Sequence, residues 1–495
     1  MDTTAIVGCF RNRSILITGS TGYLGKLLVE KMLRVQPEVR KLYLLVRAPD
    51  AAAAEQRIVD NDLFDVLREQ HGADFQSVKN KIRPLAGDMS KENFGLGSSE
   101  IVHMSLQDVD AIVNSAATTN FYNRYDVALA SNTTSVSHIC EFAHKCPRLK
   151  MLLHVSTAYL TGYEVGLLPE NLFQIGEARR EGCHLDIEAE VQLMHKVKSQ
   201  LRMSSSDDKL EKKTMKDLGL ERAKHFGWQN TYVFTKAMGE MFLGHLGQDL
   251  PVVIVRPSIV TSTIKDPMPG WIDGLTRGLD TIIVGYNYQK LPCFVVDDDA
   301  FIHAIPGDMV INAMMVAMAT HWGKPAHVLY NVSSPLHASV VLESMYSSFR
   351  TNPRTRANGR IIKNKRIPMF KKFADFRAYM ILRYKLPLEL LHSVNVLLGG
   401  VFDQYYRKAH KGYNSLMLLA KLYAPFSLFK GCFDNTNLKK LSMAMATSCE
   451  NDDASSLFHL DTSCINWSSY LINIHIPAVL EFANASTQEK KAGRS

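Results

Sequence analysis

The sequence predicts an α/β fold, a doubly wound parallel sheet with an appended, mainly helical C-terminal domain. In the first half of the chain, short apolar runs typical of strands alternate with stretches whose apolar residues recur at helical spacing. This alternation is typical of βαβ units, whose parallel sheet is covered by helices on both faces. The 495 residues are 46% hydrophobic and 21% charged, which is enough apolar content for a sizeable core.

Six apolar runs are the expected strands of this sheet: Ser14–Thr18, Lys41–Val46, Ile82–Ala86, Ala111–Val113, Met151–Val155 and Val252–Val255. We expect the sheet domain to span residues 10–349, with a charged helical insertion at about 177–224. Residues 350–372 carry nine basic residues and no acid, which indicates a linker. The helical domain then spans 373–482, and 483–495 is expected to be a frayed polar tail.

A glycine-rich loop follows the first expected strand and opens a helix. Its residues are Thr18, Gly19, Ser20, Thr21, Gly22, Tyr23, Leu24 and Gly25, which form the pattern TGxxGxxG. Glycines at this spacing allow a tight turn and close backbone approach to a pyrophosphate, whose charge the helix N-terminus favours. The loop therefore predicts a Rossmann-type dinucleotide site, with a ligand-free glycine turn as the alternative.

The second strand ends in a cation rather than an acid, which bears on the choice of dinucleotide. An acid at this point favours NAD, whereas Arg47 could bind the 2′-phosphate of NADP, and we therefore expect NADPH. The alternative is that Arg47 is simply solvated. Asp88, after the third strand, could accept a hydrogen bond from the adenine amino group or could be an ordinary turn residue. The remaining candidate cofactor contacts are Ala116, Pro257 and Ser258.

The residues Tyr232 to Lys236 form a YxxxK element in an expected helix, so phenol and ammonium lie on one helical face. A neighbouring cation favours phenolate, and we expect it to lower the pKa of Tyr232 toward proton transfer near neutral pH. YxxxK also occurs by chance on surfaces, so its context matters.

Two hydroxyls, Ser156 and Thr157, end an apolar strand at the edge where doubly wound sheets bind ligands. Thr157, or alternatively Ser156, could hydrogen-bond a substrate carbonyl that Tyr232 protonates. Asn132 could hold a water near Lys236, and the Arg256-Pro257-Ser258 run could lie against a nicotinamide ring. As plain strand caps and loop residues, these side chains would need no ligand.

The order TGxxGxxG, then Ser156-Thr157-Ala158, then YxxxK resembles the extended short-chain dehydrogenase/reductases. The runs Ile15–Lys26, His154–Tyr159 and Tyr232–Lys236 look like those of the alcohol-forming fatty acyl-CoA reductases, especially the plant branch. The run Ile465–Leu471, followed by Ile474-His475-Ile476-Pro477, is similar to that family's C-terminal domain. The resemblance covers about residues 10–482, and Tyr23 stands where the family often has Phe, a change expected to matter little.

The resemblance implies two NADPH-dependent reductions of a long-chain or very-long-chain fatty acyl-CoA, first to a bound aldehyde and then to a primary alcohol. Such alcohols supply wax, cuticle, suberin or pollen-wall lipids. By carry-over, Tyr232 is the acid, Lys236 its partner and ribose anchor, and Thr157 the carbonyl hydrogen-bonder. Gly19, Gly22 and Gly25 hold the pyrophosphate. The 75 positions from Thr157 to Tyr232 suggest a place for an acyl-tunnel wall, and the C-terminal domain is expected either to form the rest of the tunnel or to dock on a membrane.

Charge, cysteine content and hydropathy bear on the possible partners, metal sites and location of the protein. The net charge of +8 is spread along the chain and does not predict nucleic-acid binding. Eight scattered cysteines without a CxxC pair predict a reducing compartment and no metal site. The N-terminus does not show a basic start followed by a long apolar run, so we expect no signal peptide, and Leu390–Phe402 is apolar but too short to span a membrane. We expect the endoplasmic reticulum membrane, on its cytosolic face and through peripheral association, with cytoplasm as the alternative.

Three rival functions stay open at this point. One is an aldehyde-forming reductase that stops after one hydride. Another is an extended dehydrogenase/reductase or epimerase acting on a sugar nucleotide or another non-lipid substrate. The third is a non-catalytic cofactor-sensing or scaffold protein, against which the intact Thr157, Tyr232 and Lys236 argue.

Overall fold

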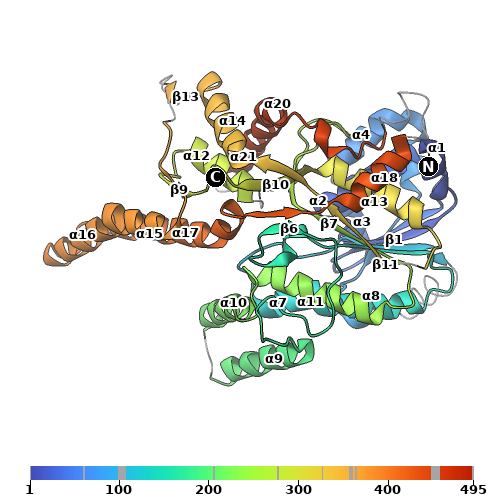
Figure 1. The fold of residues 1–495 in the computed structure, drawn as a ribbon, viewed down its shortest axis with the longest axis horizontal. Helices are drawn as coiled ribbons and strands as arrows, with labels where there is room; N and C mark the ends of the chain where they lie inside the picture. Colours follow the sequence, from blue (N-terminus) through green and yellow to red (C-terminus); the bar gives the residue numbers. More distant parts are fainter. Residues whose placement is uncertain are drawn as a thin grey trace.

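A parallel sheet is the centre of the fold. The computed structural model describes residues 2–59, 62–97, 108–204, 207–275, 278–325, 327–355, 361–362, 365–446 and 457–492. The sheet has the strand order β11-β7-β5-β4-β1-β2-β3, and every neighbouring pair is parallel (Figure 1). The strands are β1 (Ser14–Thr18), β2 (Lys41–Val46), β3 (Ile82–Ala86), β4 (Ala111–Asn114), β5 (Met151–Val155), β7 (Val252–Pro257) and β11 (His327–Val332). The predicted α/β fold is confirmed, and β11 adds a seventh strand to the six expected.

The chain reverses its direction across the sheet at β1. From β1 the chain passes through β2 to β3 at one edge, and it then crosses back to β4 on the other side of β1 and continues through β5 and β7 to β11 at the opposite edge. A crevice opens at the carboxyl ends of the strands where the order reverses. The candidate site residues on β1, β4, β5 and β7 are therefore expected at one edge of the sheet.

Helices cover both faces because side chains alternate along each strand. Ile15 and Ile17 of β1 face a core that includes residues of α2 and α13, whereas Leu16 faces a core that includes residues of α8 and α11. The helices of this domain are α1 (Thr3–Cys9), α2 (Tyr23–Val35), α3 (Ala51–Val59), α4 (Asp62–His71), α5 (Phe75–Lys79), α7 (Tyr125–Leu129), α8 (Ser135–His144), α11 (Thr231–Leu246), α12 (Gly278–Asn287), α13 (Gly307–His321) and α14 (Ala338–Thr351).

The predicted helical insertion is present as α9 (Ile187–Met203) and α10 (Asp208–His225). Ser205 and Ser206 of its polar patch lie outside the described residues. The two helices lie beside α7 and α11, away from the sheet (Figure 1). Glu190 of α9 joins them, because its carboxylate accepts hydrogen bonds from Arg222 of α10 and from the Tyr125 hydroxyl of α7.

Short strands outside the main sheet tie distant segments together. A three-stranded sheet has the order β12-β10-β8, with β8 (Ile259–Thr261), β10 (Phe301–Pro306) and β12 (Ser334–His337). Two further pairs join β6 (Gly166–Leu168) to β16 (Gly431–Phe433) and β9 (Phe294–Val295) to β15 (Met369–Phe370). These last two pairs attach C-terminal segments to the sheet domain.

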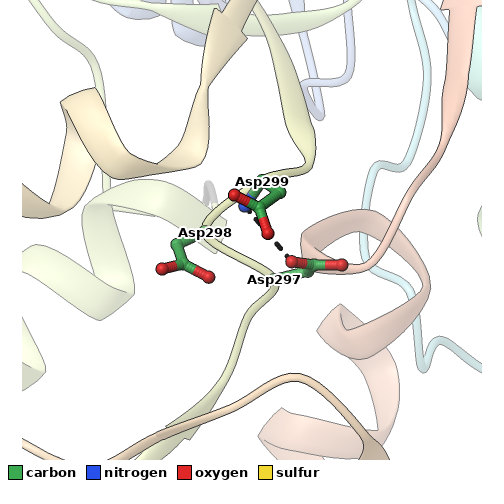
Figure 2. A group of neighbouring side chains, drawn as sticks. All are labelled: Asp297, Asp298 and Asp299. Atoms are coloured by element: carbon green, nitrogen blue, oxygen red, sulfur yellow. Dashed lines mark hydrogen bonds between the residues drawn. The ribbon is translucent and has the colours of Figure 1, made fainter.

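The basic segment 350–372 is more structured than a plain linker. It contains β13 (Arg354–Thr355), β14 (Ile361–Ile362) and β15, while Arg356, Arg360 and Lys363 lie outside the described residues. Figure 2 shows the three aspartates of 297–299, which each have one carboxylate oxygen within 4.8 Å of those of the other two. The Lys371 ammonium lies 2.7 Å from Asp298 and 2.6 Å from Asp299, and Arg366 lies 2.7 Å from Glu343. Part of the segment's charge is thus neutralised by acids of the sheet domain.

The C-terminal domain is mainly helical, as expected. Its elements are α15 (Phe373–Met380), η6 (Ile381–Lys385), α16 (Leu386–Leu397), α17 (Asp403–Ser427), β16, α18 (Thr436–Ala446), α20 (Trp467–Tyr470), η8 (Leu471–His475) and α21 (Ile476–Ala492). In Figure 1, α15, α16 and α17 form an arm that projects from the body of the molecule. The other end of α17 lies against the sheet domain.

The expected frayed tail is corrected by the structure. Residues 483–492 continue α21, and only 493–495 lie outside the described residues. The helix continues because it starts from a packed segment, in which Ile476, Val479 and Ala483 are buried, and its last five residues, 488–492, are good helix formers.

Seven cysteines fall within the described residues, and all seven are free. Cys140, Cys146 and Cys293 are buried, and burial raises the pKa of each thiol. Cys449 lies outside the described residues.

Candidate active site

The glycine loop has the backbone geometry that a pyrophosphate site requires. Gly19 has φ +69°, and a Cβ there would overlap the backbone at Ala116. A Cβ on Gly25 would overlap the Gly19 carbonyl, so α2 lies directly against the loop. Gly22 is the N-cap of α2 and has no side chain to cap it. The N-terminus of α2 is therefore bare and accessible to a phosphate, so these residues fit a dinucleotide.

The loop side chains that were predicted as cofactor contacts mostly point into the protein. The Thr18 hydroxyl donates to Asn114 Oδ1 over 2.8 Å, and buried Ser20 donates to the Leu45 carbonyl. The Tyr23 hydroxyl donates to the Thr261 carbonyl over 2.8 Å, and its ring stacks on Trp271. Tyr23 is thus not equivalent to Phe, because its hydroxyl joins α2 to the segment after β7.

Arg47 lies exposed at the end of β2, where a ribose phosphate would be expected. Arg57 of α3 was missed by the sequence reasoning, and its guanidinium donates to the Arg47 carbonyl. Arg57 also lines a small cavity with Ser20, so two cations lie near the glycine loop. Asp88 accepts hydrogen bonds from the backbone N–H and the hydroxyl of Ser90, as a turn residue does. Its contact with adenine stays a prediction.

Tyr232 and Thr157 come together. Both line one cavity with Gly19 and Gly22, and they share a hydrogen bond. Burial raises the pKa of Tyr232 to about 12, more than the bond with Thr157 lowers it. The expected lowering of this pKa by Lys236 is therefore wrong, because desolvation of the phenolate dominates.

Lys236 faces a buried network instead. Its ammonium donates to the Val155 carbonyl over 2.7 Å and lies 3.3 Å from Nε2 of His154. Burial lowers the pKa of Lys236 to about 8, and the charge of Glu240 opposes that shift. Burial, with the charge of Lys236, also holds the pKa of His154 well below its usual range.

The network continues across the sheet to the glycine loop. Nδ1 of His154 lies 2.9 Å from the Asn114 amide, which in turn accepts from Thr18. All four side chains of this network, those of Thr18, Asn114, His154 and Lys236, are buried. Thr18 ends β1, Asn114 ends β4, and His154 is the last residue but one of β5. His154 and Asn114 were missed, although a polar residue at the end of a buried apolar strand was a visible signal.

Asn132 holds the backbone rather than the ammonium. Its amide oxygen accepts from Thr118 N over 2.9 Å, and its amide nitrogen donates to the Thr118 carbonyl and the Thr235 hydroxyl. The side chain thereby fixes the loop after β4 to α11, one residue before Lys236. The predicted water near Lys236 has no support in the contacts of this side chain.

The remaining candidates divide between the cavity and the protein interior. Ser258 lines the cavity, and its buried hydroxyl has no protein partner, whereas the Pro257 carbonyl accepts from Thr157 over 3.3 Å. The Ser156 hydroxyl is buried without a partner and does not line the cavity. Arg256 is paired with Glu240 in the interior, and it too is not part of the cavity wall.

The cavity itself is large and mainly apolar. Its volume is about 440 Å³, and its wall includes Phe121, Ile259, Leu279, Ile282 and Ile302. A polar end, where Thr157, Tyr232 and the glycine loop meet, is thus continuous with space suited to a hydrocarbon chain.

The C-terminal domain completes the wall. Tyr423, Phe426 and Ser427 of α17 line the cavity, and the Phe121 ring lies 4.9 Å from that of Phe426 and 6.0 Å from that of Tyr232. Of the stretch from Thr157 to Tyr232, where a tunnel wall was expected, Tyr159 lines the cavity, whereas no described residue of the 177–224 insertion does. The insertion helices instead pack against another part of the sheet domain: Met215 and Ala223 of α10 share a hydrophobic core with residues of α7 and α11.

Comparisons with known proteins agree with this arrangement. Two family models, each described as male sterility protein, match the chain: NAD_binding_4 over residues 17–314 and Sterile over 383–484. Fatty acyl-CoA reductase 8 of Arabidopsis thaliana is 41% identical over 482 residues, which are 95% of this chain and 97% of that protein. The alcohol-forming fatty acyl-CoA reductase of Simmondsia chinensis is 38% identical, with the same coverage.

A solved structure shows the same fold. The reductase domain of a non-ribosomal peptide synthetase from Mycobacterium tuberculosis has a TM-score of 0.56 at 16% identity, covering 98% of this chain and 96% of that one. Together with the NAD-binding family model, the glycine loop indicates a nicotinamide cofactor.

Proposed function

Because this chain belongs to the fatty acyl-CoA reductase family, we propose that it reduces a long-chain or very-long-chain fatty acyl-CoA to the primary alcohol and releases CoA. The observation that carries the proposal is one cavity that joins three features. These are a glycine loop, the Tyr232 and Thr157 hydroxyls, and an apolar chamber completed by α17. A carbonyl at the polar end would place its hydrocarbon chain in the apolar part.

The hydroxyls of Tyr232 and Thr157 would both hydrogen-bond the substrate carbonyl oxygen. A bound nicotinamide cofactor would supply the hydride for each of the two reductions. As the oxygen gains negative charge, two preorganised donors stabilise it. With a pKa of about 12, Tyr232 stays protonated at neutral pH and remains available as a donor and as the acid that forms the alcohol.

We assign Lys236 a role on the cofactor side and in proton supply. Lys236 lies on α11, one turn after Tyr232. Its ammonium contacts the Val155 carbonyl and the His154 ring of β5. With a pKa of about 8, it can change its protonation state near physiological pH. Its role as a ribose anchor remains part of this proposal.

We propose NADPH as the cofactor. Exposed Arg47 and its neighbour Arg57 lie at the end of β2 and in the helix after it, with no acid at the end of that strand. Two guanidinium groups there would favour a 2′-phosphate over a free ribose hydroxyl.

We propose the cytosolic face of the endoplasmic reticulum membrane as the location, through peripheral association. Among the described residues, no helix is both long and apolar enough to cross a bilayer. A long acyl-CoA partitions to membranes, so a peripheral enzyme would meet its substrate there.

The proposal is tested by expressing the chain in yeast and profiling its lipids. The expected result is fatty alcohols that are absent from cells expressing Tyr232→Phe. Free aldehydes without alcohols would instead support the one-hydride alternative. No change in lipids, with the protein present and folded, would contradict a reductase role.

A further inference from the structure

The helical hairpin of the C-terminal arm exposes an apolar tip. This hairpin consists of α16, the turn after it and the first half of α17, and its tip is residues 390–402. Seven apolar side chains of the tip are exposed: Leu390 (68%), Val394 (39%), Val396 (65%), Leu397 (85%), Leu398 (52%), Val401 (75%) and Phe402 (41%). The tip contains no Asp, Glu, Lys or Arg. Single exposed apolar residues are normal, but a contiguous group of this kind marks an interaction surface.

Most backbone N–H groups of the turn at the tip find acceptors within the hairpin. Buried Asn395 accepts from Phe402 N over 2.6 Å through its side chain and from Gly400 N over 2.8 Å through its carbonyl. Leu398, Gly399 and Asp403 also donate their N–H groups to carbonyls within the turn. A segment that enters hydrocarbon must satisfy its backbone internally, and five of the six N–H groups of residues 398–403 have such partners.

Cations surround the base of the tip. Arg383 and Lys385 precede it, and Arg407, Lys408 and Lys411 follow it. Glu389 and Asp403 are the acids between residues 383 and 411, and they lie 3.8 Å from Lys385 and 2.7 Å from Arg407. Five cations and two acids leave a net charge of +3 for this stretch. An apolar end with a basic base matches a bilayer whose headgroups are anionic.

We propose that the hairpin inserts its tip into the headgroup and upper acyl region of a membrane containing anionic phospholipid. The inference deepens the proposed location and does not depend on the reductase reaction. α17 is one continuous 25-residue helix from the tip to Phe426 and Ser427, which line the cavity. The inserted tip would thus hold the cavity about 35 Å along this helix from the membrane.

Flotation of the full-length protein with vesicles tests the apolar contact. The vesicles are phosphatidylcholine with and without about one third phosphatidylserine. Leu397→Asp/Leu398→Asp should weaken partitioning about a hundredfold, since each leucine contributes about tenfold. The matched control is Met203→Asp/Leu210→Asp on α9 and α10, where exposure is 85% and 50%. The control should bind like the unmodified chain, and equal loss in both variants would overturn the proposal.

A second pair of variants tests the basic base. Lys408→Glu/Lys411→Glu should weaken binding to the anionic vesicles by about fivefold or more for each lysine replaced, with little effect on neutral vesicles. The matched control, Lys209→Glu/Lys213→Glu on α10, places the same charges away from the hairpin. Equal effects of the two pairs would overturn the assignment to the hairpin.

Two further measurements distinguish membrane insertion from misfolding of the variant and from a protein–protein interface at the tip. Activity on an octanoyl-CoA substrate, which is soluble without membranes, should be unchanged in the tip variant, so its loss of vesicle binding is not misfolding or loss of reductase function. Light scattering without vesicles should give the same mass for the tip variant and the unmodified chain. A dimer that the tip substitutions dissociate, with no vesicle binding, would show that the tip is a protein interface and would overturn the proposal.

Discussion

The ammonium nitrogen of Lys236 lies 3.3 Å from Nε2 of His154 in the interior of the protein. The other ring nitrogen faces Asn114, which continues to Thr18 beside the glycine loop. A neutral imidazole has one donor and one acceptor nitrogen, so its tautomer must follow the protonation state of Lys236. A charged Lys236 needs Nε2 as the acceptor, so Nδ1 then carries the proton and the Asn114 amide must turn its oxygen toward it. A neutral Lys236 can accept from Nε2–H, while Nδ1 accepts from the Asn114 amide nitrogen. His154 is therefore a positioning residue for the lysine.

Replacing His154 should change the pH dependence of the reaction. His154→Leu removes the acceptor, which disfavours charged Lys236, so the pKa of Lys236 should fall below about 8. The alkaline limb of kcat against pH should move to lower pH, with kcat at pH 7.5 reduced about tenfold. His154→Gln keeps a polar side chain and should restore part of the limb. Equal loss in both variants without a shifted limb would point to packing alone.

The lowered pKa of Lys236 also predicts a pH-dependent stability. Between about 8 and 10.5 the unfolded chain binds this proton and the folded chain does not, so the lysine's contribution to stability rises with pH there. Relative to Lys236→Met, the free energy of unfolding should gain about 2 kcal/mol between pH 8 and 9.5. Urea unfolding of both proteins at these pH values measures the difference. A difference that stays constant with pH would contradict the lowered pKa.

Arg47 should discriminate between the two nicotinamide dinucleotides. Arg47→Glu should weaken NADPH binding at least tenfold, because it replaces an attraction to the 2′-phosphate by a repulsion, and should change NADH binding little. Tryptophan fluorescence quenching measures both affinities. Lys41→Glu, at the start of the same strand, is the control and should alter neither. Equal loss for both dinucleotides in Arg47→Glu would remove the phosphate role.

A larger side chain in the apolar chamber should shorten the accepted acyl chain. Ile282 of α12 is an apolar lining residue of the cavity, and Ile282→Trp would fill part of the 440 Å³. We expect the ratio of long to short alcohol products to fall about tenfold, since one methylene changes selectivity by about 10- to 200-fold. Competition assays with mixed acyl-CoA chain lengths measure it. An unchanged profile would show that the chain does not occupy this chamber.

The fold was predictable because its signals are local and repeated. Apolar runs such as Met151–Val155 and the glycine loop after Thr18 predict strand, turn and helix without reference to the rest of the chain. The pairing of Thr157 with Tyr232 followed from their position at strand end and helix start. The structure brings these two residues into one cavity, while their chemical roles stay predictions.

Other features depend on contacts that a sequence pattern does not contain. The pKa of Tyr232 is raised because burial outweighs its neighbours, and no spacing rule measures burial. Asn132 bonds to Thr118 and Thr235 rather than reaching Lys236. The cavity wall comes from Phe426 far along the chain, and the nearer insertion packs elsewhere.

The stoichiometry of the reaction tests the central claim most directly. Purified protein is mixed with an acyl-CoA and NADPH, and NADPH oxidised, CoA released and lipid formed are measured together. The account predicts two NADPH per CoA and a primary alcohol, with turnover reduced about a thousandfold in Tyr232→Phe while the variant still binds NADPH. One NADPH per CoA with free aldehyde would contradict the alcohol-forming reaction. No thioester-dependent oxidation of NADPH, or full turnover in Tyr232→Phe, would contradict the assigned site.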